Sequence, residues 1–242
     1  MADRFPRRTG WPPGTFLGGL TPAAAGELLG LSARHRYQGG RPILREGALG
    51  SHVVVLESGF VKVTTADFAT LLGLRLPGEL IGEIGPLTGS PRSATVTACG
   101  TVHAGVVTKD AFEKFLRRHP AASTLVMAMI ARQLSWANRR RSDFAAYPAP
   151  VRLARLLAEI AETCGRDRPD GGVEITVPLS HPELAAMIAV SRATVQNAVQ
   201  ELRAAGLIAT AYRRIVVLDQ AALAAIGFGP SSIEPGPSGP DA

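Results

Sequence analysis

Two side chains of opposite charge stand close together in the segment IGEIGPLTGSPRSATV, residues 81–96. Glu83 follows Gly82, and nine residues later Arg92 precedes Ser93. Burial of an acid or a base is costly unless the charge is paired or bound to a ligand. Two arrangements therefore follow from these residue types: Glu83 and Arg92 pair with each other, or both bind a molecule taken from solution.

A second set of polar residues lies in LSHPELAAMIAVSRATVQNAVQELRAAGLI, residues 179–208. Ser180 and Glu183 have the spacing of a capping box, which predicts the start of a helix. A short Ala-Val turn follows that helix, and Ser191 can cap a second one. Two short helices joined by so short a turn are typical of the helix-turn-helix motif.

The second predicted helix begins at Arg192, and the first residues of such a helix meet base edges in the major groove. A guanidinium suits guanine, whereas the amides of Gln196 and Asn197 suit adenine. Hydroxyl groups and the basic tip of the following hairpin, ATAYRRIVVLD, can reach phosphates. The alternative is an αα-hairpin with an incidental surface arginine. The predicted DNA-binding residues are Ser180, Ser191, Arg192, Thr194, Gln196, Asn197, Arg213 and Arg214.

These two sets of residues fall in different parts of the chain. Short Val, Ile, Leu and Thr runs between glycines and prolines predict a compact unit of short strands in the first half. Helical periodicity then takes over, until Pro148 and Pro150 interrupt it. The predicted division is a loose arm (1–20), a β unit (21–119), a long helix with a hinge (120–147), a helix-turn-helix domain (148–229) and a disordered tail (230–242).

The long predicted helix carries an apolar seam with alternating spacings of four and three residues. Such a heptad pattern favours pairing with a second copy of the chain, and the alternative is an ordinary amphipathic helix that packs on its own domain. Ser123 and Arg141 interrupt the apolar character of the seam. Its members are Ser123, Met127, Ile130, Leu134, Ala137, Arg141 and Phe144.

Charge is distributed unevenly along the 242 residues. The whole chain has a formal net charge of +6. Residues 1–147 hold 18 Lys and Arg against 10 Asp and Glu, a net charge of +8. Residues 148–242 hold 8 against 10, a net charge of −2. If the second part binds DNA, local placement of its cations must provide the attraction.

Several classes of protein and site are disfavoured. The only cysteines, Cys99 and Cys164, are far apart and have no Cys-x-x-Cys spacing, which argues against disulfides, a zinc finger and an iron–sulfur cluster. No apolar run is long enough to span a bilayer, and we expect a cytoplasmic protein. We find no Walker loop, nucleophile elbow or metal-binding constellation, and we expect no enzyme activity.

From about residue 20 to 220 the chain resembles the Crp/Fnr family of transcription regulators. The matching segments are LREGALGSHVVVLESGFVKV, PGELIGEIG, PRSATV and SRATVQNAVQEL, in this order. The resemblance implies an α+β protein with an N-terminal cyclic-nucleotide-binding β-roll, a long dimerisation helix and a C-terminal winged helix-turn-helix. It implies a homodimer that binds a pseudo-palindromic operator in double-stranded DNA and works with RNA polymerase.

Within this resemblance, residues 81–96 match the phosphate-binding cassette of cyclic-nucleotide receptors. Gly82 and Glu83 would hold the ribose of cyclic AMP or another cyclic nucleotide, and Arg92 and Ser93 would hold its phosphate, for which a guanidinium is well shaped. The alternative is a vestigial pocket in which Glu83 and Arg92 pair, so that the regulator binds DNA independently of cyclic nucleotide.

Three positions depart from the family pattern. Pro86 replaces a large aliphatic residue and is expected to disturb the cassette helix. The Thr-Ser pair with which the cyclic-AMP receptor protein contacts adenine corresponds to Ala137 and Asn138, of which only Asn138 can hydrogen-bond. Arg141 is unusual in an apolar seam. Haem and iron–sulfur effectors are not expected, because the five histidines are scattered and residues 1–98 lack cysteine.

Overall fold

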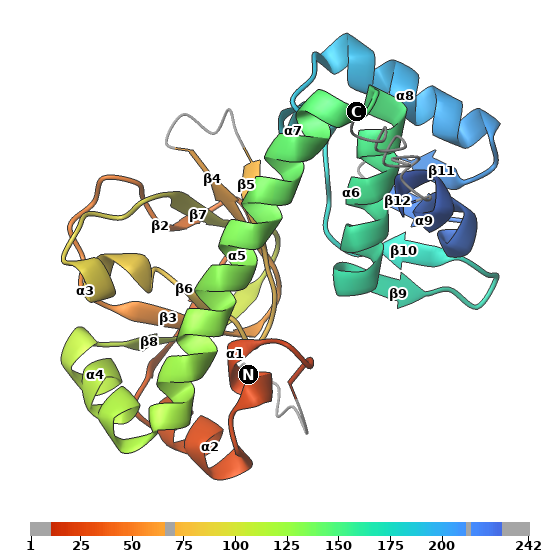
Figure 1. Cartoon of the computed structure of the whole chain (residues 1–242). Coiled ribbons are helices and arrows are strands. Elements are labelled where there is room, and N and C mark those ends of the chain that lie inside the picture. Colours follow the sequence, from red (N-terminus) through yellow and green to blue (C-terminus); the bar gives the residue numbers. More distant parts are fainter. Residues whose placement is uncertain (1–10, 66–70, 212–213, 229–242) are drawn as a thin grey trace, which may run out of the picture. The chain divides into compact units, whose positions relative to one another are not determined.

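The computed structural model describes residues 11–65, 71–211 and 214–228. These residues form two compact units (Figure 1). The division falls between Ala146 and Tyr147, and residues 182–189 group with the first unit. None of the helices in the described ranges is long and apolar enough to cross a membrane.

The first unit is built on two antiparallel sheets of four strands each, with strand orders β1-β8-β3-β6 and β2-β7-β4-β5. This arrangement confirms the predicted β-roll. Its strands are β1 (Ala33–Tyr37), β2 (Pro42–Leu44), β3 (Val53–Ser58), β4 (Val61–Thr64), β5 (Leu71–Arg75), β6 (Leu80–Ile81), β7 (Thr95–Ala98) and β8 (Val102–Val107).

Strand β3 contributes to two separate cores. Successive side chains of a strand point to opposite faces. Val54 and Leu56 pack with residues of both sheets in the interior of the roll. Val53 and Val55 point the other way, into a second core formed with the helices. All four side chains are fully buried, so this sheet is covered on both faces.

The second core involves the N-terminal segment, part of which we predicted to be a loose arm (1–20). Residues 1–10 lie outside the described residues, but the prediction is wrong for residues 11–20. Helix α1 (Phe16–Gly19) is capped by Thr15, and its Phe16 and Leu17 are 1% exposed. The Pro- and Gly-rich composition suggested a flexible segment, although the segment contains a short buried helix. Helix α2 (Pro22–Gly30) follows, with Thr21 as its cap and Pro22 in the first turn.

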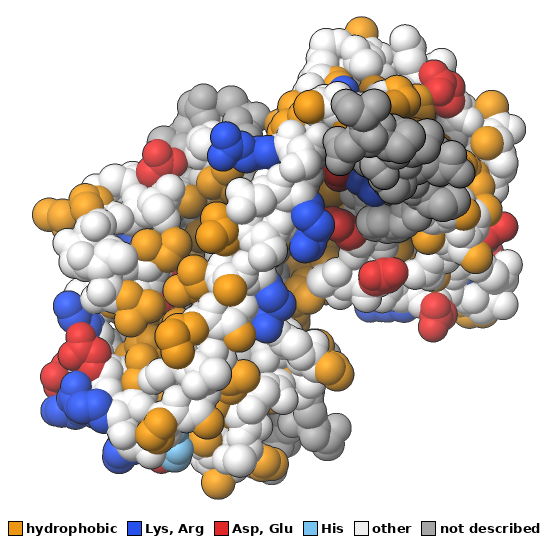
Figure 2. All heavy atoms as spheres, in the orientation of Figure 1, with side chains coloured by type: hydrophobic (Ala, Val, Ile, Leu, Met, Phe, Trp, Pro, Cys, Tyr) orange, Lys and Arg blue, Asp and Glu red, His pale blue; other side chains and the backbone are white. Residues whose placement is uncertain are grey.

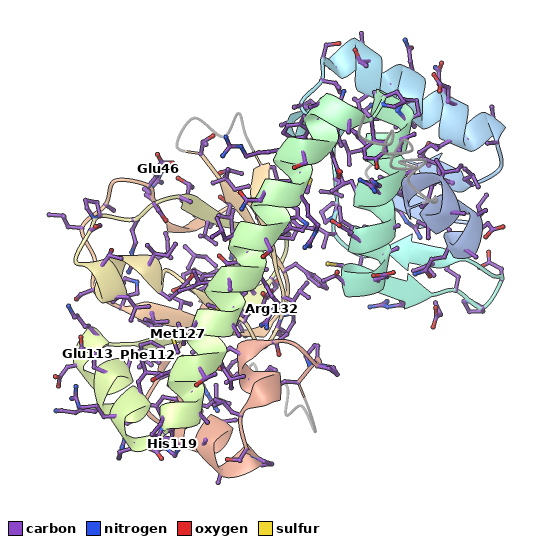
Figure 3. The ribbon with its side chains drawn as sticks, in the orientation of Figure 1. Glu46, Phe112, Glu113, His119, Met127 and Arg132 are labelled. Carbon is purple, nitrogen blue, oxygen red and sulfur yellow. The ribbon has the colours of Figure 1, made fainter. Side chains whose placement is uncertain are left out.

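Two further helices complete the first unit, α4 (Lys109–Arg118) and α5 (Pro120–Ala146). Ala122, Val126 and Met129 of α5 are buried in the second core. Figure 3 labels Arg132 on α5, near α1, and this arginine donates from Nη2 to the carbonyl of Gly14 at 2.8 Å. One side of α5 is thus fixed to its own unit.

The second unit combines helices with the sheet β11-β12-β10-β9. Its elements are α6 (Ala149–Cys164), β9 (Gly165–Asp167), β10 (Val173–Ile175), α8 (Arg192–Ala204), β11 (Ile208–Ala211), β12 (Arg214–Val217) and α9 (Gln220–Phe228). Helix α6 contributes the largest share of the core, including fully buried Leu153 and Leu157. Neither β9 nor α9 was predicted from the sequence. The predicted disordered tail, 230–242, lies outside the described residues.

Candidate effector and DNA-binding sites

The cassette segment runs from β6 through the short helix α3 (Ile84–Thr88) to β7. Glu83 is the residue that precedes α3, and Gly89, with φ 71°, is the residue that follows it. Pro86 was expected to disturb this helix. It is instead a buried residue of α3, because in the first turn its missing N–H would have no partner inside the helix anyway.

Arg92 lies inside the first unit and is 4% exposed. Its guanidinium donates from Nη1 to the carbonyl of Gly82 at 2.5 Å and from Nη2 to the carbonyl of His52 at 2.7 Å. The main chain of Arg92 also bonds the preceding loop, where its N–H donates to Ala48 and its carbonyl accepts from Gly47. Burial lowers the pKa of the guanidinium, whereas the charge of Glu83 raises it.

Glu83 is equally buried, at 4% exposed. Burial raises the pKa of its carboxyl, while its own backbone N–H and the nearby charges of Arg75 and Arg92 act in the opposite direction. Within the described residues Glu83 and Arg92 do not form an ion pair, so direct pairing is not the arrangement that the structure contains. Backbone carbonyls, rather than the carboxylate of Glu83, accept the hydrogen bonds of Arg92.

Gly82 allows this arrangement for two reasons. It has φ 75°, which side chains other than glycine rarely adopt. A Cβ atom at this position would lie 2.6 Å from Nη1 of Arg92 and 2.7 Å from Cδ1 of Leu44. Gly50 also approaches the guanidinium closely, since a Cβ there would lie 3.1 Å from Nη2. Sequence reasoning identified Gly82 but missed Gly50 and the carbonyl of His52.

The remaining two predicted ligand residues make no hydrogen bond to the guanidinium of Arg92 in the described part of the chain. Ser93 is exposed beside it, and Asn138 is exposed on α5. The hydrogen bonds of Arg92 and the charges that act on Glu83 involve neither of them. The structure therefore brings together Gly82, Glu83 and Arg92 from the predicted set.

The predicted helix-turn-helix comprises α7 (His181–Met187) and α8. Ser180 lies directly before α7 and is half-buried. Ala189, between the two helices, has φ 52°, an uncommon value for alanine. Ser191 caps α8, because its Oγ accepts from the N–H of Thr194 at 3.1 Å.

Helix α8 has one apolar and one polar face. Val195, Ala198, Val199 and Leu202 are buried in the second unit, whereas the predicted base-contacting residues Arg192, Gln196 and Asn197 are all exposed. Gln200 and Arg203 are exposed further along the helix and were not singled out, although a helical repeat of three to four residues from Arg192 would have found them.

The predicted phosphate contacts differ in their surroundings. The hydroxyls of Ser191 and Thr194 lie 2.8 Å apart and pair with each other. Arg214 begins β12 and bonds Glu174 of β10. Arg213 lies outside the described residues. No group of three His, Cys, Asp or Glu residues suited to a metal ion occurs in the described ranges.

Comparison with known proteins agrees with this division into sites. The cyclic nucleotide-binding domain model matches residues 34–119, and the Crp-like helix-turn-helix domain model matches residues 151–226. The transcriptional regulator LdrP of Thermus thermophilus is 32% identical over 171 residues, which are 69% of this chain and 83% of LdrP. The chain belongs to the Crp/Fnr family of transcription regulators.

Other members of the family match over more of their length. A CRP-like cAMP-activated global transcriptional regulator of Mycobacterium tuberculosis is 25% identical over 209 residues, which are 85% of this chain and 93% of that protein. The crystal structure of a CRP-family transcriptional regulator from Thermus thermophilus aligns with a TM-score of 0.66 and 28% identity, over 80% of this chain and 96% of that one. Proteins of this family regulate transcription.

Proposed function

We propose that this protein is a homodimeric regulator that binds a pseudo-palindromic operator through α8 and, at promoters, acts with RNA polymerase. The observation that carries the proposal is the exposed polar face of α8, with Arg192 in its first turn and a buried apolar face behind it. Two-fold symmetry would place the two half-sites about one helical turn of DNA apart.

The base-reading role of Arg192 can be tested by substitution. Arg192→Ala should weaken operator binding by about 1–3 kcal/mol and relax the preference at one base position in each half-site. Selection from random DNA by the wild-type and Arg192→Ala proteins measures this change. Arg166→Ala removes the same charge at an exposed position of β9, outside α8, and should leave the selected motif intact. An unchanged motif for Arg192→Ala would exclude a base contact.

We further propose that a cyclic nucleotide binds weakly at the cassette, with Glu83 toward the ribose and Arg92 toward the phosphate. Two features support weak binding. The guanidinium of Arg92 already bonds two carbonyls, which a phosphate must displace or share. Ala137 offers no hydroxyl to a base, and the absence of one hydrogen bond costs about 0.5–1.5 kcal/mol.

Calorimetry with cyclic AMP and cyclic GMP tests this site. We expect weak heats for the wild-type protein and a clear further loss for Arg92→Lys, because lysine lacks the planar fork of arginine. We also expect appreciable DNA binding without any nucleotide. DNA binding that strictly requires cyclic AMP, or the absence of heat at ~1 mM nucleotide, would contradict the proposal.

The alternative is a regulator whose pocket is vestigial and whose DNA binding is independent of cyclic nucleotide. The same observation favours it, since an arginine bonded to two carbonyls is stable without a ligand. Absence of heat together with normal operator binding is the result that this alternative predicts.

A further inference from the structure

The sheet of the second unit places an arginine and a carboxylate in direct contact. The Nε–H of Arg214 donates to Oε1 of Glu174 at 2.8 Å, and Nη2 lies 2.7 Å from the same oxygen in an ion pair. Glu174 is opposite Val216 in the pairing of β10 with β12, and Val216 is two residues from Arg214. The two side chains therefore share one face of the sheet as diagonal neighbours.

This contact leaves part of the guanidinium for another acceptor. The side chain of Arg214 is 59% exposed and that of Glu174 is 26% exposed. The hydrogen bond from Nε and the close approach of Nη2 both lie on one side of the guanidinium, so the Nη1 donors are not used by Glu174. A DNA phosphate at Nη1 would lie within a Debye length of the carboxylate, which is about 8 Å at physiological salt.

A second arginine of this unit also lies beside a carboxylate. Arg168, in the loop between β9 and β10, donates from Nε to Oδ1 of Asp170 at 2.7 Å and from Nη2 to Oδ2. Residues 148–242 have a net charge of −2, so each such pair offsets one of their few cations. Some of the acidic residues of the second half therefore lie in direct contact with its arginines.

We infer that Glu174 is a positioning residue that fixes the orientation of Arg214 and, by its charge, lowers the affinity of this sheet for DNA phosphate. The inference rests on the proposed DNA binding. Phosphate contacts supply nearly all of non-specific binding, whereas base contacts by α8 add only at an operator. Glu174 therefore weakens binding to arbitrary DNA and makes the protein depend more on the bases that α8 contacts.

Removal of this charge tests the inference. Glu174→Gln keeps the size of the side chain and one acceptor oxygen but removes the charge. Its affinity for a non-specific duplex should rise roughly fivefold or more at low salt for a dimer with two such sheets. A plot of log K against log salt should become steeper by about 0.9 for each sheet, because one more phosphate is neutralised. Fluorescence anisotropy over a series of salt concentrations measures both quantities.

Two matched variants separate this effect from a change in bulk charge. Glu162→Gln removes the same charge at an exposed position of α6 and should leave the salt slope unchanged. Glu174→Gln in an Arg214→Ala background should give no gain, because the arginine that the carboxylate restrains is absent. A gain that persists in that background would overturn the inference, as would equal or weaker binding by Glu174→Gln alone. Failure of the wild-type protein to bind any DNA sequence selectively would instead overturn the proposed function.

Discussion

Replacing both Met127 and Leu134 with aspartate should convert the protein into a monomer. The two side chains are 62% and 61% exposed on α5 in the single chain, and both belong to the predicted seam. Figure 2 shows hydrophobic side chains gathered along and beside α5 on the first unit. Four carboxylates in the seam of a dimer would be buried without partners, which costs several kcal/mol. Because the second half-site would then add nothing, operator affinity should fall by about 10²–10⁴-fold.

Multi-angle light scattering gives the mass of the double variant, and DNA titration gives its affinity. The control is Ala121→Asp with Ser135→Asp, which adds the same charge at exposed positions of α5 outside the seam. Ile130, the other strongly apolar member of the seam, is a poor choice because it packs against the core of the first unit and its replacement would destabilise that unit. A dimeric mass for the Met127 and Leu134 variant would exclude the seam as the dimer contact.

Gly82→Ala should destabilise the first unit by about 2–5 kcal/mol. The new Cβ would lie 2.6 Å from Arg92 and 2.7 Å from Leu44, and both of these neighbours are buried. The strain of φ 75° adds to this steric cost. The displaced guanidinium would lose its bond to the Gly82 carbonyl, so cyclic nucleotide binding should decrease as well.

Gly89→Ala is a closely matched control. Gly89 ends the same short helix with φ 71°, but a Cβ there would meet nothing within 4 Å. Its replacement should cost about 1 kcal/mol from backbone conformation alone. Urea unfolding measures the free energy of unfolding of both variants. The difference between the two values is the steric cost of a Cβ atom beside Arg92. Equal costs would mean that the guanidinium moves aside freely and that Gly82 does not hold it in place.

The sequence predicts elements well where local chemistry and periodicity agree. The cap at Ser191, the helix start at Arg192 and the short apolar run of β3 are local patterns, and the structure contains all three. The prediction for residues 11–20 was wrong because the Pro and Gly content of this segment suggested flexibility. Burial of Phe16 and Leu17 depends on residues such as Phe112, far along the chain, which no local pattern reveals.

The candidate effector site was predictable in its residues but not in its contacts. Spacing identified Gly82, Glu83 and Arg92, and the charges suggested an ion pair or a ligand. The actual acceptors for Arg92 are carbonyls of Gly82 and His52. Every residue has a carbonyl, so side-chain types give no signal for such a contact. Likewise, the pairing of Arg214 with Glu174 depends on the register of β10 and β12, which joins residues 40 positions apart.

The double role of β3 has a consequence for how the first unit unfolds and how it evolves. Val54 and Leu56 belong to one core, whereas Val53 and Val55 belong to the other. Because both cores share β3, neither core can unfold while the other stays intact. Both cores should therefore unfold in a single cooperative step. The strand should also tolerate only volume-conserving exchanges, since a larger side chain at any of the four positions would be overpacked. Sequence drift is then directed to the segments that connect the strands, and it is these segments that carry Gly82, Glu83 and Arg92.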